Sequence, residues 1–286
     1  MGLSAYFSII RPLNASVAGI AGVIGFLIAQ GTLSGQPLLP LVVVVVACIT
    51  AAGNTINDYF DRDIDRVNRP DRPLPAGKIS PHAALYFSIL LFLAGNVVAG
   101  VIALSTTPLC LLIAAGNSLI LLLYASRLKG MPLVGNIAVS YLAASVFLFG
   151  GALTGVGGMI QTLPVVLITF CAMLARELIK DAEDVAGDRE GGATTLPMII
   201  GVRKTVRYAC FAAATGVVLS YLPVVRWWGI PYLAAITAVD AVIIAGVFAA
   251  VRCTRPDCVR ESRASTLIKV GMFAALVVFI AAAVVY

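Results

Sequence analysis

The stretch L-L-P-L-V-V-V-V-V-A-C-I-T-A-A-G-N-T-I-N, residues 38–57, runs directly into the acidic sequence D-Y-F-D-R-D-I-D at residues 58–65. About 20 apolar residues in helical form span the hydrocarbon core of a bilayer. Only α-helices and closed β-barrels satisfy every backbone hydrogen bond in lipid, and a continuous apolar run without alternation excludes a barrel strand. The stretch therefore predicts a membrane-spanning helix that ends in a cluster of carboxylates.

Similar apolar runs recur along all 286 residues, of which 60% are hydrophobic and only 12% are charged. A typical soluble domain carries about twice that charged fraction. This composition excludes a disordered chain, an ordinary soluble enzyme and a nucleic-acid-binding domain driven by phosphate contacts. We expect an all-α membrane protein, a single domain over residues 1–286, with nine transmembrane helices around a central cavity. The expected spans are 13–29, 38–57, 83–104, 109–124, 133–153, 163–178, 206–225, 231–251 and 267–286.

The basic residues predict the orientation of these spans. With nine spans, 19 of the 20 Lys and Arg residues fall on the side of the N-terminus, and Arg226 alone falls on the other. Cytoplasmic loops of membrane proteins carry the excess of Lys and Arg. We therefore expect a multi-pass protein of the cell membrane with its N-terminus in the cytoplasm, its C-terminus outside, and both acidic clusters on the cytoplasmic side.

The first acidic cluster lies at the cytoplasmic end of the second expected span. If the helix continues through residue 65, at about 100° per residue, one face of about 100° holds four polar side chains: Asn57, Asp58, Asp61 and Asp65. Asp63 points elsewhere.

The second acidic cluster ends the sixth expected span, in the sequence R-E-L-I-K-D-A-E-D-V-A-G-D-R at residues 176–189. If the helix persists past Gly187, an arc of about 60° holds four carboxylates: Glu177, Asp181, Asp184 and Asp188. Glu183 points away from this arc.

Rows of like charge on a helix destabilise it, and the helix dipole adds to the repulsion at a C-terminal end. A bound divalent cation would remove this penalty, and ligands that offer only oxygen favour Mg²⁺ before Ca²⁺ or Mn²⁺. Carboxylates that flank a span are usually solvated loop residues. Two windows with the same helical phase, at the same expected membrane depth, instead favour one metal-binding pocket between the second and sixth spans.

Two motifs carry a resemblance to a known family. The pattern Asn57-Asp58-x-x-Asp61-x-x-x-Asp65, followed by N-R-P-D-R-P-L-P-A-G at residues 68–77, resembles the first motif of the UbiA-type intramembrane prenyltransferases. The pattern Asp181-x-x-Asp184-x-x-x-Asp188, with T-L-P at residues 195–197, resembles the second. Within this superfamily, residues 176–188 are most similar to the archaeal digeranylgeranylglyceryl phosphate synthases.

This resemblance implies a Mg²⁺-dependent prenyltransferase that transfers a geranylgeranyl group from its diphosphate to the glycerol hydroxyl of geranylgeranylglyceryl phosphate. The product carries the second ether bond of archaeal membrane lipids. The implied partners are the prenyl diphosphate donor, the lipid phosphate acceptor and membrane lipid, with no nucleic acid and no obligate protein partner. The family motifs assign one Mg²⁺ to Asn57, Asp61 and Asp65 and the other to Asp181, Asp184 and Asp188. The candidates for substrate binding are Asn14, Asp58, Arg69, Arg72, Tyr124, Lys129, Tyr141 and Lys180.

Two rival functions remain open at this point. A UbiA-type enzyme with the same chemistry could act on an aromatic quinone precursor or a chlorin. An acid-lined pore could instead conduct divalent cations without catalysis, although transporters usually place their ion sites near the bilayer midplane.

Three further features of the sequence concern polar residues within apolar spans and the cysteines. Asn14, one turn into the first span, suits either a cavity or a hydrogen bond between helices. Asp240 lies in the middle of an apolar span, where a carboxylate is costly, and the sequence does not reveal its role. The six cysteines are too few and too scattered to predict a disulfide scaffold, and a zinc site at Cys253 and Cys258 is not expected.

Overall fold

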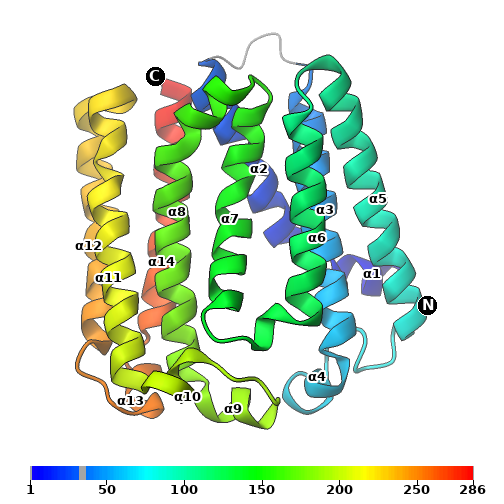
Figure 1. The fold of residues 1–286 in the computed structure, drawn as a ribbon, viewed down its shortest axis with the longest axis vertical. Coiled ribbons are helices and arrows are strands. Elements are labelled where there is room, and N and C mark those ends of the chain that lie inside the picture. The colour runs from blue at the N-terminus through cyan, green and yellow to red at the C-terminus, as the bar shows by residue number, and fades with distance from the viewer. Residues whose placement is uncertain (1, 32–36, 286) are drawn as a thin grey trace. The chain divides into compact units, whose positions relative to one another are not determined.

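Long apolar helices make up most of the protein (Figure 1). The structure is a computed structural model, and it describes residues 2–31 and 37–285. Over these residues the chain forms helices and no strands, which confirms the expected all-α class. The long helices are α2 (Pro12–Gln30), α3 (Leu39–Phe60), α5 (Pro81–Ser105), α6 (Leu109–Ser126), α7 (Val134–Ala152), α8 (Val156–Glu183), α11 (Val202–Ser220), α12 (Gly229–Ala250) and α14 (Ala264–Val285).

Short helices connect or flank the long ones. They are α1 (Leu3–Ile9), α4 (Arg62–Asn68), the 3₁₀ turn η1 (Leu128–Gly130), α9 (Val185–Glu190), α10 (Leu196–Ile200), the π-helical turn η2 (Val224–Trp228) and α13 (Pro256–Glu261).

Each of the nine expected spans corresponds to one long helix, but only part of that expectation is confirmed. Among the described residues, eight helices are long and apolar enough to cross a membrane, judged by length and composition. The helix outside this group is α11, whose 19 residues include the three basic residues Arg203, Lys204 and Arg207. The ninth span therefore stays a prediction, and residue 286, the last of the expected final span, lies outside the described residues.

The largest boundary difference concerns α8. The sequence predicts a span over residues 163–178, whereas the helix runs from Val156 to Glu183 and contains Pro164 in its interior. Proline is tolerated inside membrane helices because neighbouring groups satisfy the backbone that it leaves unpaired.

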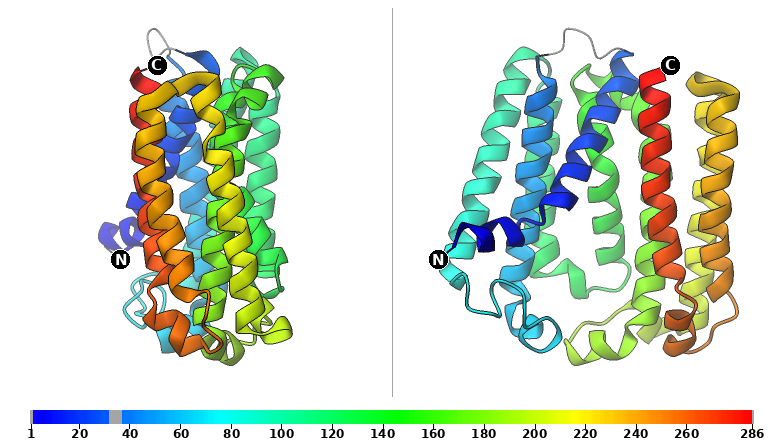
Figure 2. Two further views of the ribbon diagram at one scale, coloured as in Figure 1. Left: turned by 90° about the vertical axis from the view of Figure 1, so that its left-hand side faces the viewer. Right: turned by 180° about the vertical axis from the view of Figure 1, so that it is seen from behind.

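The chain divides into two compact units. Unit 1 contains Met1–Arg127 and Ser145–Gln161, and unit 2 contains Leu128–Ala144 and Thr162–Tyr286. Within unit 1, α3 packs against α2, α5 and α6. Figure 2 shows that α1 lies crosswise to α3 and α5 instead of running along them.

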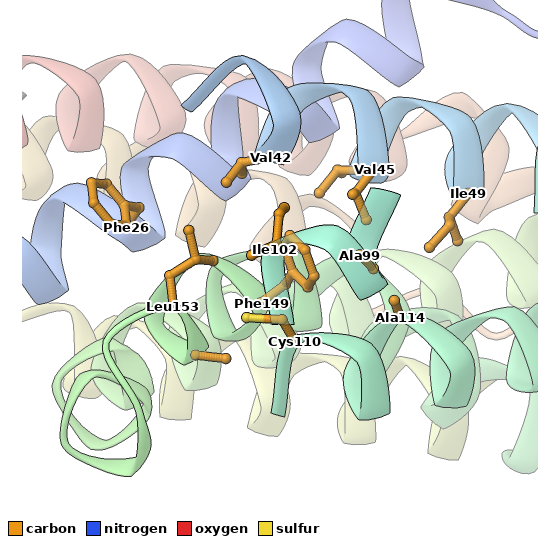
Figure 3. Packing of buried hydrophobic residues seen from close by; sticks show 12 residues of the cluster. Phe26, Val42, Val45, Ile49, Ala99, Ile102, Cys110, Ala114, Phe149 and Leu153 are labelled. Carbon is orange, nitrogen blue, oxygen red and sulfur yellow. The ribbon is translucent and has the colours of Figure 1, made fainter. Parts of the chain in front are cut away.

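The core of unit 1 combines β-branched and small residues with Phe26, Phe149 and Leu153. Val42, Val45 and Ile49 recur on one face of α3 and meet Ala99 and Ile102 of α5 (Figure 3). This spacing of three and four residues is the helical periodicity of a buried stripe.

Glycines bring α2 and α7 into backbone contact within unit 1. A Cβ on Gly25 would lie 2.2 Å from the carbonyl oxygen of Phe147, and a Cβ on Gly150 would lie 2.0 Å from that of Gly22. In lipid, where helices gain little from the hydrophobic effect, such close approach supplies the packing energy.

Within unit 2, α11 packs against α12, and α12 packs against α14. The short helices α9, α10 and α13 all lie at the end of the unit where α8 ends and α11 begins (Figure 1). A disulfide joins Cys253 to Cys258, whose Cα atoms are 5.5 Å apart, across the connection from α12 to α13. This disulfide was not predicted from the sequence: Cys253 and Cys258 were considered only as zinc ligands, and six scattered cysteines gave no reason to expect a disulfide scaffold.

Candidate active site

The first acidic cluster lies where α3 passes into α4. The helix is interrupted at Asp61, but the backbone hydrogen bonds of helical spacing continue across the break. The N–H of Asp61 donates to the carbonyl of Asn57 at 2.9 Å, and the N–H of Asp65 donates to that of Asp61 at 2.8 Å. The predicted helical phase is therefore preserved: Asp58, Asp61 and Asp65 are buried, whereas Asp63 is exposed.

Side chains from two other segments neutralise the buried carboxylates of this cluster. Nη1 of Arg72 lies 3.1 Å from Oδ1 of Asp58 and 2.5 Å from Oδ2 of Asp65. Arg11, the residue between α1 and α2, also pairs with Asp58. Within the cluster, Nδ2 of Asn57 donates to Oδ2 of Asp61 at 2.7 Å. Buried carboxylates need such partners because an unpaired charge in a poorly solvated place is very costly.

Hydrophobic anchors hold the loop that carries Arg72. Leu74 and Ile79 are buried, and they pack with Ala5 and Ile9 of α1. The loop also turns back on itself, since the N–H groups of residues 78 and 79 both donate to the carbonyl of residue 73. These contacts hold the loop in place, so that the side chain of Arg72 reaches the carboxylates.

The second acidic cluster lies where α8 passes into α9, and its geometry repeats that of the first. The N–H of Asp184 donates to the carbonyl of Lys180 at 3.1 Å, and the N–H of Asp188 donates to that of Asp184 at 2.9 Å. Asp181 and Asp188 are half-buried and Asp184 is exposed. The helical phase again persists through a break.

A hydrogen bond holds one carboxylate of the second cluster, and nearby charges shift the pKa of another. Nδ2 of Asn136, at the start of α7, donates to Oδ2 of Asp181 at 2.9 Å. Burial raises the pKa of Asp188, and the charge of Asp184 raises it further, while Lys180 and Lys129 lie near enough to oppose the rise. Lys180 and Lys129, both predicted as substrate-binding residues, thus act electrostatically on a carboxylate of the second cluster.

Glu183 points away from the cluster, as the sequence predicts, and binds the start of α14. Its carboxylate accepts hydrogen bonds from the Ser265 hydroxyl at 2.8 Å and the Ser265 N–H at 3.4 Å. Nη2 of Arg260 in α13 donates to the carbonyl of Glu183 at 2.9 Å and lies 3.5 Å from Oδ1 of Asp184. Arg260 therefore satisfies a carbonyl at the C-terminal end of α8.

The remaining predicted substrate-binding residues occupy varied positions. Asn14 is exposed on α2, and Arg69 is exposed at the end of α4. Tyr124 in the last turns of α6 and Tyr141 in α7 are half-buried. The roles of these four residues in substrate binding stay predictions.

A model of the UbiA prenyltransferase family matches residues 18–277. The chain belongs to the UbiA prenyltransferase family. It is 54% identical over 285 residues to the digeranylgeranylglyceryl phosphate synthase of Methanoculleus marisnigri, covering 100% of both chains. It is 41% identical over 285 residues to the synthase of that name from Thermococcus kodakarensis, again covering 100% of both.

Solved structures agree with this family assignment. A structure described as that of digeranylgeranylglyceryl phosphate synthase in membranes has a TM-score of 0.82 at 35% identity, covering 99% of each chain. A UbiA homologue from Archaeoglobus fulgidus bound to GPP and Mg²⁺ shares the fold, with a TM-score of 0.65 at 18% identity, over 94% of this chain and 99% of that one.

The donor chemistry of this UbiA chain suits Mg²⁺, because the ligands predicted in both clusters are carboxylate and amide oxygens. Over residues 2–31 and 37–285, no three carboxylate, cysteine or histidine side chains converge closely enough to hold an ion by themselves. Mg²⁺ is usually bound by one or two carboxylates together with water and substrate phosphates. The arrangement therefore fits an ion that is completed by an anionic substrate better than a resident, fully protein-bound ion.

Three residues of this UbiA chain contact the clusters without having been predicted as site residues. They are Arg11, Asn136 and Arg260, and a fourth, Ser265, holds Glu183 on the opposite face of the second cluster's helix. The signal for Asn136 was a lone amide at the start of an apolar span, next to Gly135. Arg260 gave no usable signal, because it is one of many basic residues in loops that the positive-inside rule already explains.

Proposed function

We propose that this UbiA family member transfers a geranylgeranyl group from geranylgeranyl diphosphate to the glycerol hydroxyl of geranylgeranylglyceryl phosphate. The product carries the second ether bond of archaeal membrane lipids. The observation that carries the proposal is the 54% identity, over the full length of both chains, to a digeranylgeranylglyceryl phosphate synthase.

The two acidic clusters supply the metal ligands in this proposal. Asn57, Asp61 and Asp65 would hold one Mg²⁺, and the other would be held by the second cluster through Asp181, Asp184 and Asp188. When bound, Mg²⁺ supplies positive charge that stabilises the departing diphosphate. Each helix is interrupted, at Asp61 and at Asp184, but backbone hydrogen bonds of helical spacing continue across both breaks. The carboxylates of each cluster therefore stay in helical phase, which supports this assignment.

The basic side chains beside the clusters bind the anionic groups of the two substrates. Arg72 already pairs with Asp58 and Asp65, and it exchanges part of this pairing for the diphosphate. Lys129 and Lys180, which lie near Asp188, contact phosphate oxygens. Arginine offers a planar fork of donors for phosphate, whereas lysine offers a compact point charge.

The reaction breaks the allylic C1–O bond of the donor and forms a C1–O bond to the acceptor. The bonding electron pair leaves with the diphosphate. The acceptor oxygen attacks C1, and its proton passes to the diphosphate or to a cluster carboxylate. The allylic cation must be kept from water, and Tyr124 and Tyr141 are the aromatic side chains proposed to face it.

The proposal includes the membrane topology. Nine transmembrane helices, with α11 as the seventh, surround a central cavity in one domain. The N-terminus and both clusters face the cytoplasm, and the C-terminus lies outside. The 19 basic residues on the proposed cytoplasmic side support this orientation. Asn14, Asp58 and Arg69 complete the proposed substrate-binding residues.

An assay of donors and acceptors tests the function. The protein in membranes or detergent is given geranylgeranyl diphosphate, with and without Mg²⁺, and either geranylgeranylglyceryl phosphate or an aromatic acid as acceptor. The proposal expects Mg²⁺-dependent ether formation with the glyceryl phosphate alone. Turnover with the aromatic acid instead would keep the prenyl transfer and overturn the acceptor, and metal flux into sealed vesicles without turnover would overturn the enzyme assignment.

A further inference from the structure

The segment that joins α6 to α7 is held in a single strained conformation. We call residues 128–136 the α7 corner. Leu133 has the left-handed backbone conformation, with φ of 64°, which leucine rarely adopts. Gly135 packs so closely that a Cβ there would lie 2.6 Å from the carbonyl oxygen of Leu128. Strain of this kind persists only where the surroundings fix the backbone, and it often marks functional sites.

The α7 corner belongs to the same unit as the second acidic cluster and is attached to it at two places. The N–H of Thr194, in the segment after α9, donates to the carbonyl of Gly130 at 3.1 Å. Lys129, in the same corner, carries the charge opposite to that of Asp188 and interacts with it electrostatically. The corner therefore interacts both with Asp188 of the cluster and with Thr194, six residues further along the chain.

Asn136 makes the third attachment and contacts a carboxylate of the cluster directly. Its side chain is only 7% exposed, and Nδ2 donates to Oδ2 of Asp181 at 2.9 Å. The first cluster contains the same pairing, because Nδ2 of Asn57 donates to Oδ2 of Asp61 at 2.7 Å. In the first cluster the amide comes from the same helix, four residues earlier. In the second it comes from another helix.

We infer that Asn136 is a positioning residue of the second cluster, which orients the Asp181 carboxylate for a divalent cation. The inference rests on the proposed function, in which Asp181 is a metal ligand. A hydrogen bond from a fixed amide limits rotation of the carboxylate, and loss of such a partner typically lowers metal affinity by about 10- to 100-fold. The strained backbone of the α7 corner fixes the amide in turn.

A purely structural role for Asn136 makes a different prediction. Buried amides in membrane helices often bond to a neighbouring helix simply to satisfy their own polar groups. In that case removal of the amide lowers stability and leaves metal affinity unchanged. Asn117 provides the matched control. It is 9% exposed, and its Nδ2 donates at 2.9 Å to the hydroxyl of Ser145 instead of to a carboxylate.

The test is a Mn²⁺ titration of the full-length protein in detergent, followed by electron paramagnetic resonance, in the presence of inorganic pyrophosphate, which stands in for the diphosphate of the donor. It is made in the Asp61→Asn background so that the second cluster dominates binding. Asp184→Asn in this background identifies the signal of the second cluster. Asn136→Ala and the shape-conserving Asn136→Leu are expected to weaken that signal by about 10- to 100-fold. Asn117→Ala is expected to stay within about twofold.

The outcomes separate the inference from the proposal beneath it. If Asp184→Asn leaves Mn²⁺ binding intact, the metal assignment of the second cluster is wrong. If Asp184→Asn removes binding but both Asn136 variants bind Mn²⁺ like the parent, the inference is overturned. As a second readout, Asn136→Leu should raise the Mg²⁺ concentration needed for half-maximal turnover while saturating Mg²⁺ restores most of the rate. A lost rate that Mg²⁺ does not restore would also overturn the inference.

Discussion

The guanidinium of Arg72 lies 2.5 Å from the carboxylate of Asp65. The same nitrogen, Nη1, lies 3.1 Å from Asp58, so one cation bridges two carboxylates that are separated by two helical turns. The side chains of Asp58 and Asp65 are only 4% and 8% exposed. Without Arg72 the carboxylate of Asp65 would lose its cation in a poorly solvated place, which makes this residue a stabilising group as well as a proposed ligand of the diphosphate.

Replacement of Arg72 by glutamine should therefore destabilise the protein. Removal of one partner of a buried ion pair costs about 3–5 kcal/mol, because the remaining charge stays buried without compensation. We expect Arg72→Gln to lose about 3 kcal/mol of unfolding free energy and to weaken binding of the diphosphate donor. Thermal unfolding in detergent and the donor KM measure the two effects.

Arg66 is the matched control for this variant. It pairs with Asp63 at 3.2 Å, but both side chains are about two-thirds exposed, at 67% and 65%. Exposed ion pairs contribute about 0–1 kcal/mol. Arg66→Gln should thus leave both stability and donor KM nearly unchanged, and an equal loss in the two variants would show that the burial of Arg72 is irrelevant.

The helical phase of the first cluster makes a separate prediction about Asp63 and Asp65. The two residues lie in the same short helix, yet Asp65 is 6% exposed and Asp63 points into solvent. Asp65→Asn should reduce turnover at saturating substrate by about 100-fold or more, because a weakened ligand lowers metal affinity on this scale. Asp63→Asn should retain nearly full turnover. Similar losses in both variants would contradict the assignment of one helical face to the metal.

The sequence predicted the helices and the faces of the two clusters, because both follow from local periodicity. An apolar run long enough to span lipid has few alternative structures. The arc of about 60° in the second cluster survives the break at Asp184, because the hydrogen bond from Asp188 to Asp184 keeps helical spacing there. The same periodicity correctly assigned Asp63 and Glu183 to other faces.

Partners that come from distant segments could not be predicted in this way. Arg11 reaches Asp58 across 47 positions, Asn136 reaches Asp181 across 45, and Arg260 reaches Asp184 across 76. Such pairings depend on how the helices pack, and a list of 20 basic residues does not show which of them turns toward a cluster. The predicted span was also too short at α8, which runs from Val156 to Glu183 with Pro164 inside it.

Asp240, whose role the sequence did not reveal, is part of a buried hydrogen-bonded group. The hydroxyl of Ser220 lies 2.7 Å from Oδ2 of Asp240, and the hydroxyl of Tyr232 donates to the carbonyl of Ser220 at 2.9 Å. The group ties the end of α11 to α12. Asp240→Asn keeps a polar partner for Ser220 and should change stability by less than about 1 kcal/mol, whereas Asp240→Ala should cost about 1–2 kcal/mol.

Turnover distinguishes this structural role of Asp240 from a catalytic one. Because its hydrogen bonds are made within unit 2, to α11, we expect kcat of the folded Asp240→Asn enzyme to stay within about threefold of the wild type, by the usual size of effects outside the reacting groups. A loss of turnover in Asp240→Asn without any change in thermal unfolding would instead place Asp240 in the catalytic machinery.

The contact between α2 and α7 gives the last prediction, which concerns Gly150. A Cβ at this position would lie 2.0 Å from the carbonyl oxygen of Gly22 and 2.5 Å from the backbone nitrogen of Phe26. Backbone atoms cannot move aside as the end of a side chain can, so the two helices must separate. Overpacking of this kind costs about 1–3 kcal/mol, occasionally more, and we expect Gly150→Ala to lie at the upper end.

Gly100 in α5 is the control, because a Cβ there meets nothing within 4 Å. Gly100→Ala should be neutral or stabilising by up to about 1 kcal/mol. Thermal unfolding of both variants decides the matter, and an unchanged midpoint for Gly150→Ala would mean that α2 and α7 are not in backbone contact.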